Sequence, residues 1–259
     1  MATATKNESP STAIAVIKTD GYLALQEGGA IAEAMEANMG ADAALRESDL
    51  TRVPIPTGGG TTWLVPTIGD DKAVKSIDGI LVAMCLRGLL WAGDEPEEGS
   101  LPVLVSHDLK TARLVAAENV DAAMLRAIEP AKMADGRYDW SKLPQNEWGT
   151  GKKGHGKAAK EQRVLYVLPA DEPLPVVVII QPGSLKDWQK FVVSLTKAGI
   201  PYYRAVVSLT LEKDTAAEGQ PFARVVPKLI GTISEAEGKV IRVKFTEPMK
   251  AVAACAFAG

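Results

Sequence analysis

Residues 76–91 read SIDGILVAMCLRGLLW, a nearly continuous apolar run. Strands that are covered on both faces show such runs, whereas a strand with one wet face alternates apolar and polar residues. We therefore expect a pair of strands here, buried on both faces, although a buried helix gives the same pattern. Either structure places this stretch in the core.

Two β-branched runs stand further along the chain, RVLYVL at 163–168 and VVVII at 176–180. The segment between them, PADEPLP, holds three prolines and is typical of a turn, so the runs predict a strand pair. Residues 184–198 then carry apolar side chains on one helical face and lysines on the other. Ser184 stands at the N-cap position with Asp187 three residues on, which predicts an amphipathic helix.

Residues 202–212 and 222–231 alternate apolar and polar side chains, which predicts two more strands with one face turned inward. Pro227 cannot donate to a sheet ladder, so the second strand is expected at a sheet edge or with a bulge there. Residues 234–244 begin like a capped helix but end with strand-like alternation, and the pattern leaves both structures open.

Shorter elements are expected elsewhere: a helix at 29–40, a glycine turn at 58–60 before a strand from Thr61, an acidic loop at 94–98, a hairpin at 103–115, a helix at 119–128 and a long loop at 133–151. This order describes a β-rich α+β protein with one amphipathic helix and peripheral helices. Its sheet is expected to be a small barrel of the OB type or a twisted antiparallel sheet. A single domain at 21–259 would follow a flexible tail at 1–20.

The composition limits the classes of function. A chain of 259 residues with 46% hydrophobic side chains can build a sizeable core, and its net charge of -3 means that a nucleic-acid site must be a local basic patch. Cys85 and Cys255 stand far apart in apolar surroundings, which favours free thiols in a reducing cytoplasm. His107 and His155 are the only histidines and no paired cysteine motif occurs, so no metal or cofactor is expected. No signal peptide or membrane span is indicated.

The most distinctive stretch is WGTGKKGHGKAAKEQR at 148–163, a basic and glycine-rich loop. Glycine lets a backbone approach phosphates and lysine supplies point charges, so this composition suits a phosphate-tracking loop. An exposed loop that is basic for no functional reason has the same composition. The positive residues are Lys152, Lys153, Lys157, Lys160 and Arg163. A nucleotide-binding loop is not expected, because Ala158 stands where Ser or Thr must bind magnesium.

Aromatic residues beside basic ones indicate a surface on which unpaired bases can stack while cations hold the backbone. On the two late strands these are Tyr202 with Arg204, and Phe222 with Arg224 and Lys228. If the strands pair, one sheet face would present both sets. Trp63 and Trp148 are further candidates for stacking, although tryptophan more often packs in a core.

Catalytic constellations are weak, and an enzyme is not expected. Neither histidine stands in a nucleophile motif, and the sequence contains neither G-x-S-x-G nor H-E-x-x-H. Carboxylates dispersed along the chain could still form a nuclease site, since such a site leaves no local signature.

Several motifs together resemble single-stranded DNA-binding proteins of the OB type that phages and prophages encode in replication and recombination modules. They are GGGTTW at 58–63, WGTGKKGHGK at 148–157, LYVL at 165–168, LP at 174–175, PGSLKDW at 182–188 and TLEK at 210–213. The resemblance spans about 52–233 and implies sequence-independent binding of single-stranded DNA, with partners among the other proteins of such a module. The alternatives are a nucleic-acid enzyme or recombination accessory factor, and a structural or assembly protein whose outward faces make a homo-oligomer.

Overall fold

The computed structural model describes residues 14–26, 33–34, 37–38, 45–67, 69–93, 100–115, 120–216 and 219–257. The strands are β1 (Arg52–Val53), β2 (Trp63–Val65), β3 (Lys72–Val74), β4 (Ser76–Leu90), β5 (Leu104–Ser106), β6 (Thr111–Leu114), β7 (Tyr138–Asp139), β8 (Lys160–Leu168), β9 (Val176–Ile180), β10 (Ala205–Thr215) and β11 (Pro221–Thr232). The α-helices are α2 (Ala122–Ile128), α3 (Leu185–Lys197), α4 (Glu235–Ile241) and α5 (Glu247–Cys255), and a π-helical turn at Arg242–Thr246 joins the last two.

The apolar run at 76–91 forms one strand of 15 residues, β4, and not the predicted strand pair. Its glycines, which could have marked turns, lie where other segments come close. A Cβ on Gly79 would meet the carbonyl oxygen of Leu168 at 2.3 Å, and one on Gly88 would meet the ring of Trp140 at 2.5 Å. Glycine thus permits close packing along β4, and the strand runs on without a turn.

β4 is a central strand of the sheet and pairs with three other strands. It pairs with β10 along 76–80, with β8 along 80–89 and with β5 along 88–90, in each case antiparallel. The register with β8 shifts between Leu81 and Ala83, as at a β-bulge. The Val82 carbonyl oxygen at this shift accepts a hydrogen bond of 2.6 Å from the hydroxyl of Thr246, in the π-helical turn. The β-bulge and the π-helical turn therefore lie in contact, and this hydrogen bond gives the Val82 carbonyl a partner.

Within the described residues nine strands form one sheet in the order β1-β9-β8-β4-β5-β6-β7, to which β10 and β11 are attached through β4. The β1–β9 pair is parallel, so the sheet is mixed. The chain is thus a sheet-rich α+β protein, as predicted, but the sheet does not close, and a closed barrel of the OB type is wrong. Among the described residues, the edge strands β1, β7 and β11 do not pair with one another.

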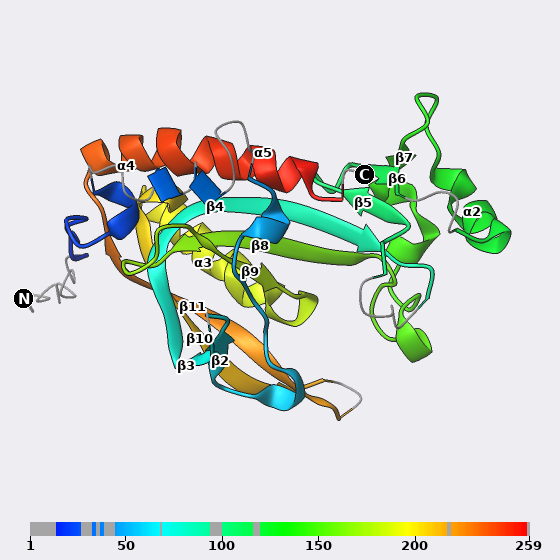
Figure 1. The fold of residues 1–259 in the computed structure, drawn as a ribbon. Coiled ribbons are helices and arrows are strands. Elements are labelled where there is room, and N and C mark those ends of the chain that lie inside the picture. Colours follow the sequence, from blue (N-terminus) through cyan, green and yellow to red (C-terminus); the bar gives the residue numbers. More distant parts are fainter. Residues whose placement is uncertain are drawn as a thin grey trace, which may run out of the picture.

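Helices cover both faces of this sheet. In Figure 1 the α4–α5 helix lies along one face and α3 lies against the other. The first layer buries Ile241, Phe245 and Met249 against β4 and β8. The second buries Trp188 and Phe191 of α3 against β8, β9 and β10. The predicted amphipathic helix is confirmed as α3.

A smaller cluster closes one end of the sheet, around β5, β6, β7 and α2 (Figure 1). Trp140 and Tyr138 are its largest buried side chains. The hairpin predicted at 103–115 is confirmed as β5–β6, and the described part of the helix predicted at 119–128 is α2. The loop predicted at 133–151 contains the short strand β7, which pairs with β6.

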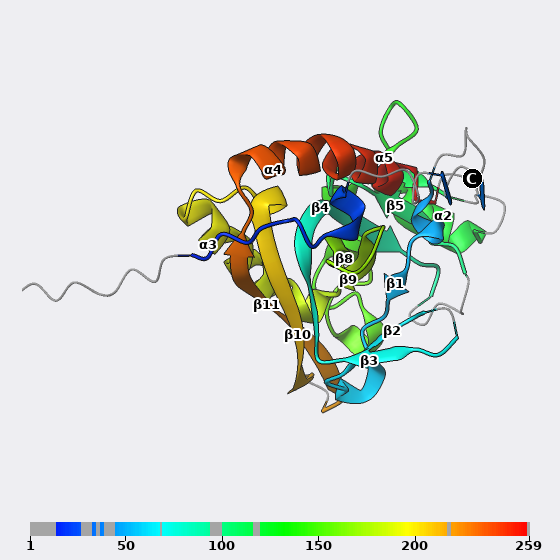
Figure 2. The same cartoon turned by 60° about the vertical axis from the view of Figure 1, so that its left-hand side comes forward.

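β11 is a sheet edge, as the position of Pro227 predicted, and its open side makes hydrogen bonds at Val225 and Thr232. The Val225 N–H donates to the hydroxyl of Ser184 over 2.9 Å, so Ser184 does not cap α3 with its side chain as predicted. Two residues on, Pro227 has no N–H to leave unpaired. Thr232 exchanges hydrogen bonds with Ala15 and Ile17, of 2.9 and 2.7 Å. The described end of the expected tail, from residue 14 on, therefore runs beside this strand (Figure 2).

The segment 234–244, which the sequence left open, is helical. Ser234 and Glu237 form a capping box at the start of α4, and Glu237 also accepts hydrogen bonds from Thr19. Of the helix predicted at 29–40, the described residues 33–34 and 37–38 are helical, and the rest lies outside the described residues, as does the acidic loop at 94–98. Cys85 and Cys255 are free thiols. No helix in the described ranges is both long and apolar enough to cross a membrane.

Candidate nucleic-acid interface

The basic loop is a compact turn held by its own backbone. The N–H groups of Gly149 and Gly151 both donate to the Gly156 carbonyl, over 2.7 and 3.2 Å. Gly151 is buried, and a Cβ there would meet the His155 carbonyl oxygen at 2.2 Å. Gly149, Gly154 and Gly156 have φ between 65° and 92°, a region that favours glycine. The glycines are thus needed to fold the loop.

Contacts with the loop and its base hold Lys157, Lys160 and Arg163. Lys157 donates to the Asn146 side chain over 3.0 Å and lies 3.5 Å from Glu161. Lys160 donates to the carbonyl of Lys157. Arg163 is half-buried in β8, where burial lowers the pKa of its guanidinium and the charge of Glu161 partly opposes this. These groups shape the base of the loop.

The exposed tip of the loop carries Lys152 and Lys153, with Trp148 at its start. The Trp148 side chain is 82% exposed, whereas Trp63, Trp140 and Trp188 are buried. The loop closes so that the Gly154 carbonyl oxygen lies 3.8 Å from the place of a Cβ on Gly149. Trp148 and Lys153 are the chain neighbours of these two glycines. The closure of the loop therefore brings the backbone positions of Trp148 and Lys153 near one another.

Trp63, the second tryptophan predicted for stacking, is a core residue. Its exposure is 0%, and its indole N–H donates to the Leu209 carbonyl of β10 over 2.9 Å. Its prediction as a stacking residue is therefore wrong. The reason is that β2 folds its side chain against β10, a contact between residues 146 positions apart.

The two late strands pair as predicted, but they do not bring their aromatic residues together. Tyr202 lies in a 3₁₀ turn before β10, while Phe222 pairs with Asp214 near the other end of β10. The strand has 11 residues, which at about 3.3 Å per residue separates its ends by roughly 30 Å. The prediction of a shared stacking face is therefore wrong.

The aromatic and basic side chains on this ribbon also have structural contacts. Tyr202 packs edge-to-face on Tyr203, with 5.7 Å between the ring centroids. Arg204 donates to the Ile233 carbonyl over 3.1 Å. The ring of Phe222 lies over Gly183, where a Cβ would meet it at 2.8 Å. These residues fix chain segments to one another.

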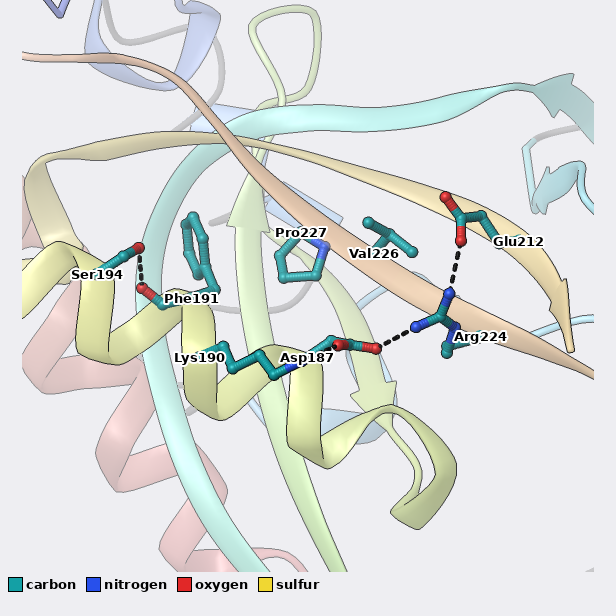
Figure 3. A pocket seen from close by; sticks show the side chains of 8 residues that line it. All are labelled: Asp187, Lys190, Phe191, Ser194, Glu212, Arg224, Val226 and Pro227. Atoms are coloured by element: carbon teal, nitrogen blue, oxygen red, sulfur yellow. Dashed lines mark hydrogen bonds and ion pairs between the residues drawn. The ribbon is translucent and has the colours of Figure 1, made fainter. Parts of the chain in front are cut away.

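Arg224 lies among carboxylates at a shallow groove between α3 and β11 (Figure 3). Its nitrogens lie 2.6 Å from Asp187, 2.7 Å from Glu212 and 3.3 Å from Asp214. The groove has a volume of about 480 Å³, and Phe191 and Pro227 form its apolar part. Lys228 stands exposed beyond it on β11. The positive charge of Arg224 is thus neutralised by acidic residues, which does not suit a phosphate site.

A buried polar cluster, which the sequence analysis missed, lies on the face of the sheet beneath the α4–α5 layer. Arg87 of β4 is 2% exposed and donates both terminal nitrogens to Glu47, over 2.8 and 2.5 Å. The hydroxyl of Tyr166 donates to the same carboxylate over 2.7 Å. Burial raises the pKa of Glu47, but the hydrogen bonds and charge of Arg87 outweigh it, so the pKa is lowered. Burial also raises the pKa of Cys85 to about 11. The signal in the sequence was Arg87 itself, the one charge between Gly79 and Trp91.

The cluster continues to His107 and Arg113. Arg113 donates to the Ala256 carbonyl over 3.1 Å, and the Arg87 guanidinium lies 5.5 Å from the ring centroid of Phe257. Burial, and then the charges of Arg87 and Arg113, lower the pKa of His107. The Nε atoms of both arginines and the Nε2 of His107 are buried without a hydrogen-bond partner among the described residues.

In the described ranges, no group of three or more His, Cys, Asp or Glu side chains is placed so that it could hold a metal ion.

Comparisons with protein-family models, with curated proteins and with solved structures each returned no significant match.

Proposed function

We propose that this protein binds single-stranded DNA, without reading its sequence and without catalysis, through the tip of the loop at 148–157. The observation that carries the proposal is Trp148, a large aromatic side chain left 82% exposed in the same loop as the exposed Lys152 and Lys153. Bases stack on such a ring while ammonium groups contact the phosphates. The motifs resemble those of phage single-stranded DNA-binding proteins, which supports the same ligand. The partners that this resemblance implies are replication and recombination proteins.

This interface is smaller than the one expected from the sequence. Trp63 is buried, Arg224 is neutralised, and the ends of the β10–β11 ribbon are far apart, so none of them joins the loop in one groove. The loop alone offers one stacking platform. Stacking on a single aromatic ring is worth about 1–3 kcal/mol per base, which predicts modest affinity for one or two nucleotides per protein.

Salt dependence follows from the same count of cations. Lys152 and Lys153 are the exposed lysines of the tip. Neutralising two phosphates of a single strand gives a slope of log affinity against log salt of about -1.4. The whole chain has a net charge of -3, so distant charges do not add to this attraction.

The test is a titration with oligo-dT that follows tryptophan fluorescence at two salt concentrations. We expect quenching in the native protein and its loss in Trp148→Phe, because the other tryptophan rings are more protected. The double variant Lys152→Ala/Lys153→Ala should bind at least tenfold more weakly. The matched control removes two exposed lysines of α3, Lys186→Ala/Lys197→Ala, and should bind within twofold of the native protein.

If both double variants bind oligo-dT equally weakly, the interaction is general charge attraction. The loop is then not the binding site. Absence of quenching by oligo-dT at low salt would overturn the function itself. Cleavage of the oligonucleotide by pure protein with magnesium would instead indicate an enzyme.

A further inference from the structure

We propose that Arg87, Arg113 and His107 form a second binding site, for a phosphate group, and that Ala256 and Phe257 cover it in the described structure. This site is separate from the loop at 148–157 and does not depend on the proposed function. It is assembled by the sheet and covered by the turn that follows α5.

Strand register brings the three side chains to one region of the sheet. Gly88 of β4 pairs with Ser106, the last residue of β5, so Arg87 and His107 each lie one residue beyond this pair. Arg113 lies on β6, opposite Val105. The charges of both arginines lower the pKa of the His107 imidazole, in keeping with this placement.

One of the two arginines lacks a carboxylate partner among the described residues. Glu47 neutralises Arg87, but no carboxylate in the described part of the chain pairs with Arg113. Asp108 is the other nearby acid, and its carboxylate already accepts hydrogen bonds from the backbone of Lys110 and Thr111. A partly buried cation without an ion-pair partner in the described structure, as Arg113 is, can be stabilised by a bound anion.

Unused nitrogen atoms point to the same ligand. Buried polar atoms are nearly always hydrogen-bonded, and each exception requires an explanation. Here three exceptions come together, Nε of Arg87, Nε of Arg113 and Nε2 of His107. Guanidinium groups match the oxygens of phosphate, and a neutral imidazole can donate one more hydrogen bond.

The groups that cover the site imitate parts of such a ligand. The Ala256 carbonyl oxygen takes one hydrogen bond from Arg113, at 3.1 Å, as a phosphate oxygen would. The Phe257 ring lies over the Arg87 guanidinium. Phe257 has φ of 61°, in the left-handed region that non-glycine residues avoid. The cover is therefore held in a strained backbone conformation, and a phosphate competes with it for the same donors.

Equilibrium dialysis against inorganic phosphate tests the site, with Phe257→Ala as the uncovered variant. We expect this variant to bind one phosphate at least tenfold more tightly than the native chain. Adding Arg113→Ala to it should abolish that binding. Val243→Ala, an exposed apolar residue on the neighbouring helical turn, serves as the control and should behave as the native chain does. If Phe257→Ala lowers the melting temperature strongly, Phe257→Leu replaces it.

A second arm uses a 5′-phosphorylated mononucleotide in place of inorganic phosphate. Tighter binding of the nucleotide assigns the site to a nucleotide phosphate, and equal binding assigns it to the free anion. The Lys152→Ala/Lys153→Ala variant should keep phosphate binding, and its loss there would move the site to the loop and overturn the proposal. Equal phosphate binding by the native, Phe257→Ala and Arg113→Ala proteins would overturn the proposal as well.

Discussion

The loop at 148–157 and the β10–β11 ribbon contain the same kinds of residue, aromatic side chains next to lysine and arginine, but they present them differently. In the loop an indole and two lysines are exposed. In the ribbon Arg224 is surrounded by Asp187, Glu212 and Asp214.

A cation that carboxylates from distant parts of the chain already neutralise, as at Arg224, is not available to phosphates. Asp187 is 37 positions from Arg224 in the chain, and α3 brings it there. In the loop, by contrast, the partners of Lys157 and Lys160 are local, at Asn146, Glu161 and the loop backbone, and the tip extends beyond them.

The largest expected effect separates two tryptophans. Trp63→Ala removes a fully buried ring and its hydrogen bond to Leu209, and should lower the free energy of unfolding by about 3–5 kcal/mol. Trp148→Ala should change that free energy by less than about 0.5 kcal/mol, because its ring is exposed. Urea unfolding measures both. Similar losses of unfolding free energy in the two variants would contradict the contrast between the tryptophan packed against the ribbon and the exposed one in the loop.

A glycine of the loop gives the next effect. A Cβ at Gly151 would lie 2.2 Å from the His155 carbonyl oxygen, so Gly151→Ala must displace the turn. We expect a loss of about 1–3 kcal/mol of stability, as for overpacked sites, and weaker oligo-dT binding. Gly93→Ala, where the added carbon meets nothing within 4 Å, is the control in thermal unfolding and titration. Unchanged binding in Gly151→Ala would show that the turn's shape is irrelevant to the interface.

Removing the ribbon's arginine should have a smaller effect on stability. Arg224→Ala breaks an ion-pair network that is partly exposed, which costs about 1 kcal/mol or less in urea unfolding. Its affinity for oligo-dT should stay within twofold of the native value. A tenfold loss of affinity would place the ribbon back in the interface.

The last prediction concerns the pH dependence of stability at Glu237, in the helix that follows β11. Burial would raise the pKa of Glu237, but hydrogen bonds from Ser234 and Thr19 outweigh it and lower the pKa to about 2. A carboxyl whose pKa is lowered on folding stabilises the protein above its unfolded pKa, near 4.5, and loses this contribution as the pH falls toward 2. Glu237→Gln should therefore be less stable than the native chain at pH 6, with the difference shrinking at pH 3. A difference that is constant across this range would contradict the pKa shift.

Local pattern predicted the elements whose causes are local. The apolar face of α3 and the alternation along β10 and β11 needed no distant partner. The length of β4 could not be predicted in this way, because Gly79 and Gly88 read equally well as turn residues until Leu168 and Trp140 are known to lie against them.

The candidate site was predictable to a similar extent. Trp148 and the lysines of the tip were found from composition alone. The burial of Trp63 and the link from Arg87 to Glu47 could not be found, since both contacts join distant parts of the chain, 146 and 40 positions apart.

The occupied edge of β11 has a consequence for encounters between molecules. A second chain that tried to extend the sheet there would meet a donor already used at Val225, a ring without a donor at Pro227, and residues 15–17 beside Thr232. Such an approach cannot form a regular ladder. Intermolecular strand exchange and fibre growth are thus disfavoured along this side, even when the protein is concentrated.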